Sequence, residues 1–253
     1  MPRTKVNGHD HFWEEFGSAS SSDVMVMLHG AAGSGRAFYP VAEQLARDGW
    51  RVIVPDMRAM GRSEHVAEIP PSAWVDDLAA LLDYLKVQKA VIEGTSLGMR
   101  VALKFGILHP DRVRALVLES SIVANEAGGN AALNQNFSAL SDEMKARHKA
   151  NHGDDWETVV KNYFSIRNKP ELQEFYNLRE AAKTVQLPTL LLRGDKDEPV
   201  HPLAHTVELR QSMQTSRMAV VPNNGTGVIG THPDEFRRLL KQFMATMATQ
   251  AAS

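Results

Sequence analysis

Short runs of apolar residues, each bounded by turn-forming residues, recur along the chain. They occupy residues 24–28, 52–54, 90–92, 115–118, 189–192 and 218–221. The runs are continuous rather than alternating, which is typical of strands buried on both faces of a parallel sheet.

Between these runs the apolar positions follow helical spacing. The predicted helices cover residues 36–48, 72–86, 97–108, 202–213 and 233–247. Strands that alternate with helices predict an α/β fold, with a mostly parallel sheet, helices on both faces and right-handed crossovers. The first 16 residues differ, because Asn7-Gly8 between two short apolar stretches predicts a hairpin. We expect this hairpin to add an antiparallel edge to the sheet.

Residues 122–184 interrupt the alternation and contain three candidate helices, at about 132–150, 154–166 and 170–183. We therefore predict a core made of residues 1–121 and 186–253, with a helical cap at 122–185 inserted into it. The cap should lie over the carboxyl edge of the sheet, where ligands bind in open α/β folds. Its aromatic residues, Trp156 among them, either pack the cap onto the core or line a pocket.

Composition excludes several classes of protein. The 253 residues include 28 Lys and Arg against 30 Asp and Glu, so no basic surface for nucleic acid is expected. No apolar run approaches the length of a membrane span, and the start of the chain does not resemble a secretory signal. With no cysteine, thiol chemistry is excluded. We expect a cytoplasmic protein, monomeric or homodimeric, that acts on a small molecule.

The first glycine-rich loop runs from Gly30 to Ala37, after a predicted strand. Its glycine spacing is that of a phosphate-binding loop, but Arg36 and Ala37 stand where lysine and a hydroxyl residue are needed. No nucleotide or other cofactor is therefore expected. The loop is either a plain strand-to-helix turn or an oxyanion loop, in which Gly30 lets the chain turn and the Ala31 N–H points into the site.

The second loop, Gly94-Thr95-Ser96-Leu97-Gly98, fits the pattern G-x-S-x-G between a predicted strand and a predicted helix. A sharp turn there needs small residues on both sides of the serine and lifts its hydroxyl above the sheet. The helix N-terminus favours developing negative charge, and the Leu97 N–H is the second candidate oxyanion donor.

At this point the sequence resembles the α/β-hydrolase superfamily nearly from end to end. The matching segments are the hairpin up to Phe16-Gly17, His29-Gly30, the loop Asp56-Met57-Arg58-Ala59-Met60-Gly61-Arg62-Ser63, Ser96 and Gly194-Asp195-Lys196-Asp197. The stretch Arg100–Leu103 with His109-Pro110 is similar to the menaquinone-pathway hydrolases, the meta-cleavage-product hydrolases and the enol-lactonases. The resemblance implies Ser96 as nucleophile and Asp197 as the acid of a triad.

The sequence departs from the family where the catalytic histidine is expected. Thr226 stands in its place, and Pro233 at the start of the last helix keeps the usual spacing. A threonine hydroxyl cannot act as a base near pH 7, and a serine without a base is a weak nucleophile. We therefore expect an impaired, altered or deliberately disabled site. Two alternative bases are His201, which follows the Asp197 loop, and His232, beside the last helix.

Other residues are candidates for lining or supporting the site. His29 is expected to brace the oxyanion loop beside Gly30, and Met99 and Ala59 add bulk where the family often has glycine. Glu93 and Glu119 end buried strands, so Glu93 is expected either to pair with Arg100 or to serve as an acid or base with a raised pKa. Glu119 is an alternative triad acid. No histidine spacing indicates a metal.

Three functions remain open from the sequence. The first is a serine hydrolase that acts on an ester, a lactone or a carbon–carbon bond of a small apolar carbonyl compound. The second is a lyase or isomerase that keeps the oxyanion donors without the serine–histidine relay. The third is a protein that binds a small ligand without chemistry.

Overall fold

The computed structural model describes residues 3–251, except the side chains of Asn136 and residues 248–251. Eight strands form one sheet in the order β1-β2-β4-β3-β5-β6-β7-β8. Their bounds are β1 Arg3–Val6, β2 His9–Phe16, β3 Val24–Leu28, β4 Arg51–Asp56, β5 Ala90–Thr95, β6 Val113–Glu119, β7 Thr189–Gly194 and β8 Ser216–Val221. From β4 to β8 in this order neighbouring strands are parallel, while β2 is antiparallel to both β1 and β4. The predicted hairpin is present, and its turn residues Asn7 and Gly8 both have positive φ.

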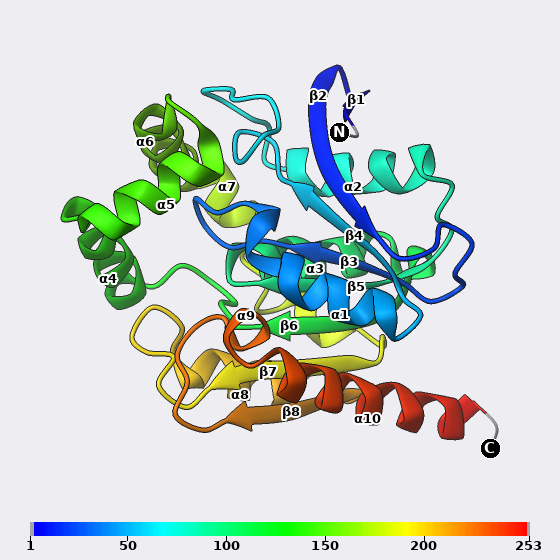
Figure 1. Ribbon diagram of the computed structural model, residues 1–253. Coiled ribbons are helices and arrows are strands. Elements are labelled where there is room, and N and C mark those ends of the chain that lie inside the picture. The colour runs from blue at the N-terminus through cyan, green and yellow to red at the C-terminus, as the bar shows by residue number, and fades with distance from the viewer. Residues whose placement is uncertain (1–2, 252–253) are drawn as a thin grey trace.

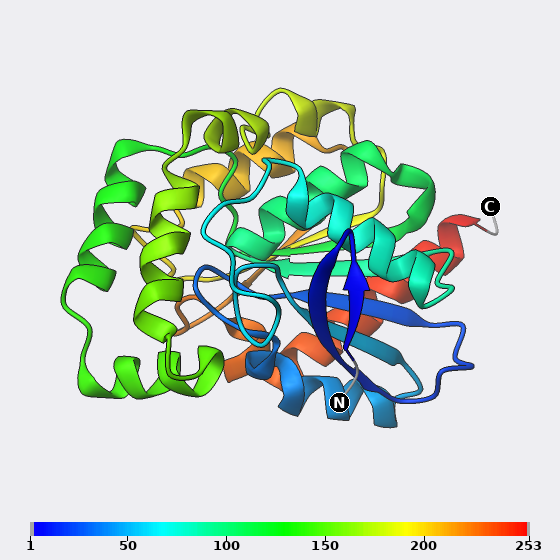
Figure 2. The ribbon, with the colours of Figure 1, turned by 90° about the horizontal axis from the view of Figure 1, so that it is seen from above.

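Helices cover both faces of the sheet, as the alternation of patterns predicts (Figures 1 and 2). One face packs against α1 (Tyr39–Arg47) and α10 (Pro233–Ala251), and the other against α2 (Ala73–Tyr84), α3 (Leu97–Leu108) and α8 (Leu203–Ser212). Two apolar clusters of buried side chains fill these layers. Short helical turns lie at η1 (Gly35–Phe38), η2 (Pro110–Arg112) and α9 (Val228–Thr231).

The segment 122–185 lies between β6 and β7, and its helices stand beside the carboxyl ends of the strands (Figure 1). It contains α4 (Ala127–Ser138), α5 (Asp142–His152), α6 (Trp156–Arg167), α7 (Pro170–Phe175) and the turn η3 (Ala181–Thr184). Two of the three helices predicted there are wrong in extent. The first is split at residues 139–141, because Ser141 caps α5 by accepting a hydrogen bond from the Met144 N–H at 3.2 Å. The third ends at Phe175.

The order of strands places two loops next to each other. The chain moves outward from β3 to β4 and then returns to the other side of β3 to form β5. The carboxyl ends of β3 and β5 therefore flank the point where the direction of winding reverses, which is the usual position of a ligand site in an open α/β sheet. The loop after β3 begins at His29, and the loop after β5 carries Ser96.

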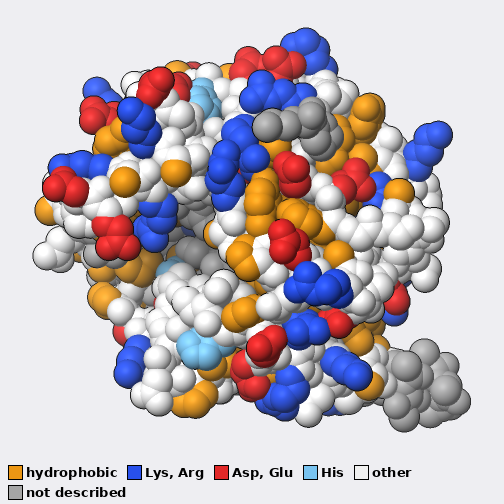
Figure 3. All heavy atoms as spheres, in the orientation of Figure 1, with side chains coloured by type: hydrophobic (Ala, Val, Ile, Leu, Met, Phe, Trp, Pro, Cys, Tyr) orange, Lys and Arg blue, Asp and Glu red, His pale blue; other side chains and the backbone are white. Residues whose placement is uncertain are grey.

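Two further observations concern the helices and the surface of the molecule. No helix within residues 3–251 is long and apolar enough to cross a membrane. On the face seen in Figure 3, acidic and basic side chains are interspersed, as the balanced charge predicts.

Candidate active site

Ser96 occupies the turn between β5 and α3 that the sequence motif predicts. Its φ is 57°, a left-handed conformation that non-glycine residues rarely adopt. Glycine is needed on both sides because the backbones meet there. A Cβ at Gly94 would lie 2.2 Å from the Gly98 oxygen, and a Cβ at Gly98 would lie 2.0 Å from the Leu28 oxygen. The turn around Ser96, called the elbow below, therefore brings the backbones of β5, α3 and β3 into close contact, which holds the serine in one orientation.

An imidazole lies within hydrogen-bonding distance of the Ser96 hydroxyl, and it belongs to His201. The His201 Nε2 atom is 2.9 Å from Ser96 Oγ, and its Nδ1 atom is 2.7 Å from Asp197 Oδ1. His201 and Asp197 lie on the loop between β7 and α8, and both are buried. Hydroxyl, imidazole and carboxylate thus form one hydrogen-bonded chain.

The expectation that Ser96 lacks a neighbouring imidazole is therefore wrong. Thr226 lies close to the same point, after β8, and its hydroxyl donates to Asp197 Oδ1 at 2.5 Å. Its oxygen is also 3.2 Å from His201 Nδ1. Since β7 and β8 are parallel neighbours, their following loops meet at one edge, and a histidine on either loop can reach the same place. His232, the other alternative, is bonded through Nδ1 to the Thr231 hydroxyl instead.

Arg193, which sequence reasoning missed, braces the loop that carries Asp197 and His201. It is 2% exposed, and its guanidinium donates to the backbone oxygens of Gly194, Asp197 and His201 at 3.0, 3.1 and 3.4 Å. A buried arginine at the end of a strand needs such acceptors. An arginine in the otherwise apolar run of β7 was the available signal for this role.

The electrostatics of the chain favour an ionised Asp197. Burial acts to raise the pKa of this carboxyl, but the hydrogen bond and charge of His201, with the hydroxyls of Ser120 and Thr226, outweigh it and hold the pKa below its usual value. An ionised carboxylate that accepts the His201 Nδ1–H leaves Nε2 free to accept the serine proton.

The candidate oxyanion donors belong to the two loops that the strand order places next to each other. Leu97 begins α3, and Ala31 follows Gly30 in the loop after β3; both residues line a cavity beside Ser96. His29 holds this loop, because its Nε2 accepts from the Met57 N–H at 3.0 Å and its Nδ1 lies 2.9 Å from the Gly30 oxygen. Burial lowers the pKa of His29, so its ring is neutral at pH 7.

Two carboxyl groups lie under the elbow without any exposure to solvent. Thr95 Oγ1 is 3.1 Å from Glu93 Oε1 and 2.7 Å from Glu119 Oε2. One hydroxyl proton serves only one of these contacts, so the other requires a proton on a carboxyl group. In accordance with this, burial and the neighbouring Glu119 raise the pKa of Glu93 well above its usual value, and burial raises that of Glu119 to about 7.

The expected Glu93–Arg100 ion pair is wrong. Arg100 turns away from the sheet toward the segment 122–185, where it donates to Asn125 Oδ1 at 2.9 Å and to the Tyr176 oxygen at 2.5 Å. Burial lowers its pKa to about 10, which still leaves it charged at pH 7. Arg167, from α6, lines the same cavity and donates to Asn130 Oδ1 at 2.7 Å.

Several candidates for lining the site lie outside the cavity beside Ser96. Met99 is fully buried, and its sulfur accepts from the Ile122 N–H at 3.4 Å. Trp156 stacks on His148 with 5.9 Å between ring centroids. Ala59, with φ of 68°, lies in the turn after β4. Neither Met99 nor Ala59 narrows this cavity.

Comparison with known proteins concerns the fold and the family of the chain. Residues 23–147 match the family model described as alpha/beta hydrolase fold. The chain is 22% identical over 244 residues to the AB hydrolase superfamily protein YisY of Bacillus subtilis, covering 87% of this chain and 90% of that protein. It is 26% identical over 246 residues to the 2-hydroxy-6-oxo-2,4-heptadienoate hydrolase of Pseudomonas putida, covering 87% and 88%. The solved structure of Est816, described as an N-acyl homoserine lactone degrading enzyme, superposes with a TM-score of 0.80 at 24% identity, covering 96% of this chain and all of that one.

Proposed function

We propose that this chain, which belongs to the α/β-hydrolase superfamily, is a serine hydrolase in which His201 replaces the usual histidine of the triad. The observation that carries the proposal is the hydrogen-bonded chain from Ser96 through His201 to Asp197. This chain of hydrogen bonds favours a hydrolase over the lyase and ligand-binding alternatives, which do not need a serine–histidine relay.

In the proposed reaction Ser96 Oγ attacks the carbonyl carbon of the substrate while His201 Nε2 takes its proton. Asp197 keeps the imidazole oriented and stabilises its charged form. The N–H groups of Ala31 and Leu97 donate to the oxyanion that develops on the carbonyl oxygen. His201 then returns the proton to the leaving group. A water molecule, activated by the same imidazole, hydrolyses the acyl-enzyme and regenerates the serine.

The substrate that we propose carries a carboxylate near the reacting carbonyl group. Arg100 and Arg167 both line the cavity beside Ser96, and the hydrogen-bond partners described for their guanidinium groups are uncharged oxygens of Asn125, Tyr176 and Asn130. Two buried guanidinium groups without a carboxylate favour an anionic ligand, which accepts charge-assisted hydrogen bonds. This replaces the expectation of an apolar substrate. Several relatives have carboxylates in their names, among them the heptadienoate hydrolase and a 2-hydroxy-6-oxononadienedioate hydrolase of Comamonas testosteroni.

We also propose that residues 122–185 act as a cap. The cavity beside Ser96 holds about 30 Å³, far less than the roughly 300 Å³ at the lower end of ordinary ligand sites. Its wall includes Ile122, Leu133, Tyr163 and Leu172 from this segment. A substrate therefore enters only when these side chains, or the helices that carry them, move away from the elbow.

The direct test is the rate at which a fluorophosphonate labels Ser96. We expect fast labelling of the unchanged protein, none of Ser96→Ala, and a decrease of about 10³-fold or more in His201→Gln, because removal of the base leaves only the oxyanion hole and binding. His232→Gln is the matched control and should label at the original rate. Equal labelling of His201→Gln and the unchanged protein would contradict the assignment of the base.

A further inference from the structure

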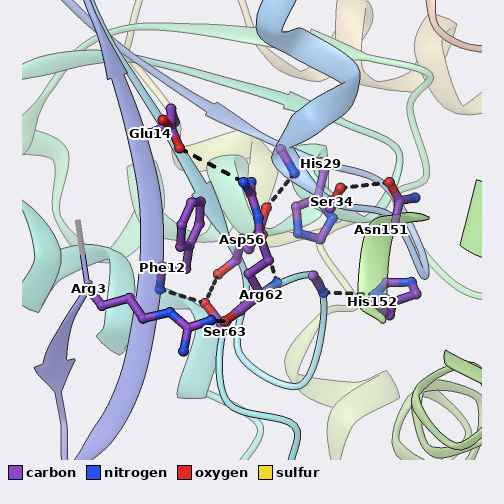
Figure 4. Close-up of polar contacts among 12 residues, drawn as sticks. Arg3, Phe12, Glu14, His29, Ser34, Asp56, Arg62, Ser63, Asn151 and His152 are labelled. Carbon is purple, nitrogen blue, oxygen red and sulfur yellow. Dashed lines mark hydrogen bonds and ion pairs between the residues drawn. The ribbon is translucent and has the colours of Figure 1, made fainter. Parts of the chain in front are cut away.

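The C-terminal end of α5 contacts the loop that carries the candidate oxyanion donor Ala31. His152, the last residue of α5, accepts a hydrogen bond at Nδ1 from the Gly61 N–H at 2.9 Å, and its Nε2 lies 3.0 Å from the Ala32 oxygen. Next to it, the Ser34 hydroxyl donates to Asn151 Oδ1 at 2.9 Å. Figure 4 shows the side chain of Asn151 joined to Ser34 and the ring of His152 joined to the backbone N–H of Gly61.

The geometry fixes the protonation of this ring. Because Nδ1 accepts from a backbone N–H, the proton of a neutral imidazole is on Nε2, which donates to the Ala32 carbonyl. The pKa of His152 is lowered to about 4, mainly by burial; the Ala32 carbonyl acts to raise this pKa, and the neighbouring imidazoles of His29, His148 and His65 act to lower it. The ring is therefore neutral at pH 7, and one imidazole joins three separate segments of the chain.

Ala32 is a position where the backbone needs such support. It is buried, and its φ of 46° lies in the region that favours glycine. It is the third residue of a tight turn closed by the Gly33 N–H, which donates to the Gly30 oxygen at 3.2 Å. Ala31 occupies the second position of this turn, so the direction of its N–H depends on the turn keeping its shape.

We propose that His152 is a positioning residue of the oxyanion hole. It holds the Ala32 carbonyl, so the turn Gly30–Gly33 keeps its correct shape only while α5 lies against the core. The inference rests on the proposed hydrolase function. Its consequence is that transition-state stabilisation is complete only while the segment 122–185 is docked. A substrate bound under an undocked segment meets the nucleophile but not a fully formed oxyanion hole.

Three substitutions at this position separate the two contacts. His152→Phe keeps an aromatic ring at this position but loses both hydrogen bonds. His152→Asn keeps an acceptor for the Gly61 N–H but is too short to reach Ala32. His152→Gln carries an acceptor and a donor at a spacing similar to that of the imidazole nitrogens, so it can retain both. His65→Phe is the matched control, since His65 contacts the Gly61 oxygen and Asp155 at the same interface but not the oxyanion loop.

With an activated ester as substrate, we expect kcat to fall about 10- to 100-fold in His152→Phe and His152→Asn, with KM changed less than about threefold. This size lies below the 10²- to 10³-fold loss that follows complete removal of an oxyanion donor. His152→Gln and His65→Phe should stay within about threefold of the original kcat. Ala32→Gly added to His152→Asn should recover part of the loss, because glycine adopts the positive φ without support.

Hydrogen–deuterium exchange of residues 29–37 supplies a readout that needs no activity, so it tests the contact even if Ser96 proves not to be a nucleophile. We expect faster exchange in His152→Asn than in the unchanged protein or in His152→Gln. Unchanged kcat in His152→Asn, or unchanged exchange of the loop, overturns the proposal. So does a loss of kcat in His65→Phe equal to that in His152→Asn, because the interface as a whole would then be responsible.

Discussion

His201 and Thr226 lie 25 residues apart in the sequence, yet both contact the same oxygen of Asp197. An imidazole serves a nucleophile through the position of its nitrogen atoms, whichever loop supplies it. The four-residue spacing from Asp197 to His201 keeps the proposed acid and base on one loop, and Arg193 donates to three backbone oxygens of this loop and its start. Thr226 stands where the resemblance to the family predicts a histidine, and its hydroxyl is a second hydrogen-bond donor to the Asp197 carboxylate. This donor helps to keep Asp197 ionised.

At the scale of a single residue, Arg100 should decide which substrates are accepted. For an ester that carries a carboxylate, we expect Arg100→Met to lower kcat/KM about 10- to 100-fold, because a hydrogen bond to a charged group contributes about 1.5–3 kcal/mol. For a neutral ester of the same size, the change should be less than about threefold. Kinetics with the matched pair of esters give this ratio. Equal losses for the two esters would mean that Arg100 supports the site only through packing.

At the scale of elements, the turn between β5 and α3 depends on close backbone contact. The strand, the helix and the end of β3 approach one another so closely that only glycine fits at positions 94 and 98. In the proposed reaction, the N-terminal amide groups of the helix beneath point toward the carbonyl of the substrate. The same crowding gives Ser96 its strained φ of 57°.

Gly98→Ala should therefore damage both stability and catalysis. We expect the free energy of unfolding to decrease by about 1–3 kcal/mol, as for overpacking in a core, and fluorophosphonate labelling to slow by more than tenfold. Gly128→Ala is the control, because this glycine is helical and has no neighbour within 4 Å of an added Cβ. It should stabilise α4 slightly. Urea unfolding and labelling rates measure both effects, and normal labelling of Gly98→Ala would contradict the close contact.

At the scale of the whole molecule, the two buried carboxyls under the elbow link stability to pH. The pKa of Glu119 is raised to about 7 in the folded protein, above the 4.5 of an exposed glutamate. Below pH 4.5 Glu119 is protonated in both the folded and the unfolded state, and the contribution of this buried carboxyl to stability is fully present. As pH rises from 4.5 to 7, the unfolded chain has released the proton that the folded state still holds, so stability falls. Above about pH 7 the folded state releases this proton as well, and the loss of stability levels off.

We expect Glu119 to contribute a fall in the free energy of unfolding between pH 5 and pH 7, with a slope of up to about 1.4 kcal/mol per pH unit. The buried neutral imidazoles of His29 and His152 add a contribution of opposite sign below about pH 6.5, so the slope due to Glu119 is the difference between the unchanged protein and a variant at this position. Glu119→Gln should flatten this slope by about one proton, since the amide oxygen still accepts from Thr95. Asp154→Asn is the control, because the side chain of Asp154 is 95% exposed. Urea unfolding at several pH values measures the slopes, and an unchanged slope in Glu119→Gln would show that this carboxyl is ionised in the folded state.

The sequence by itself determined the alternation of strands and helices, the N-terminal hairpin and the elbow around Ser96. These follow from local periodicity and from turns that only certain residues can form, so neighbours along the chain carry the information. Only the tertiary structure decided that His201 approaches Ser96, that Arg100 turns toward Tyr176 rather than Glu93, and that His152 reaches Ala32. The physical reason is that each of these contacts joins segments far apart in the sequence. Their meeting depends on strand order and on the path of loops, which no local pattern encodes.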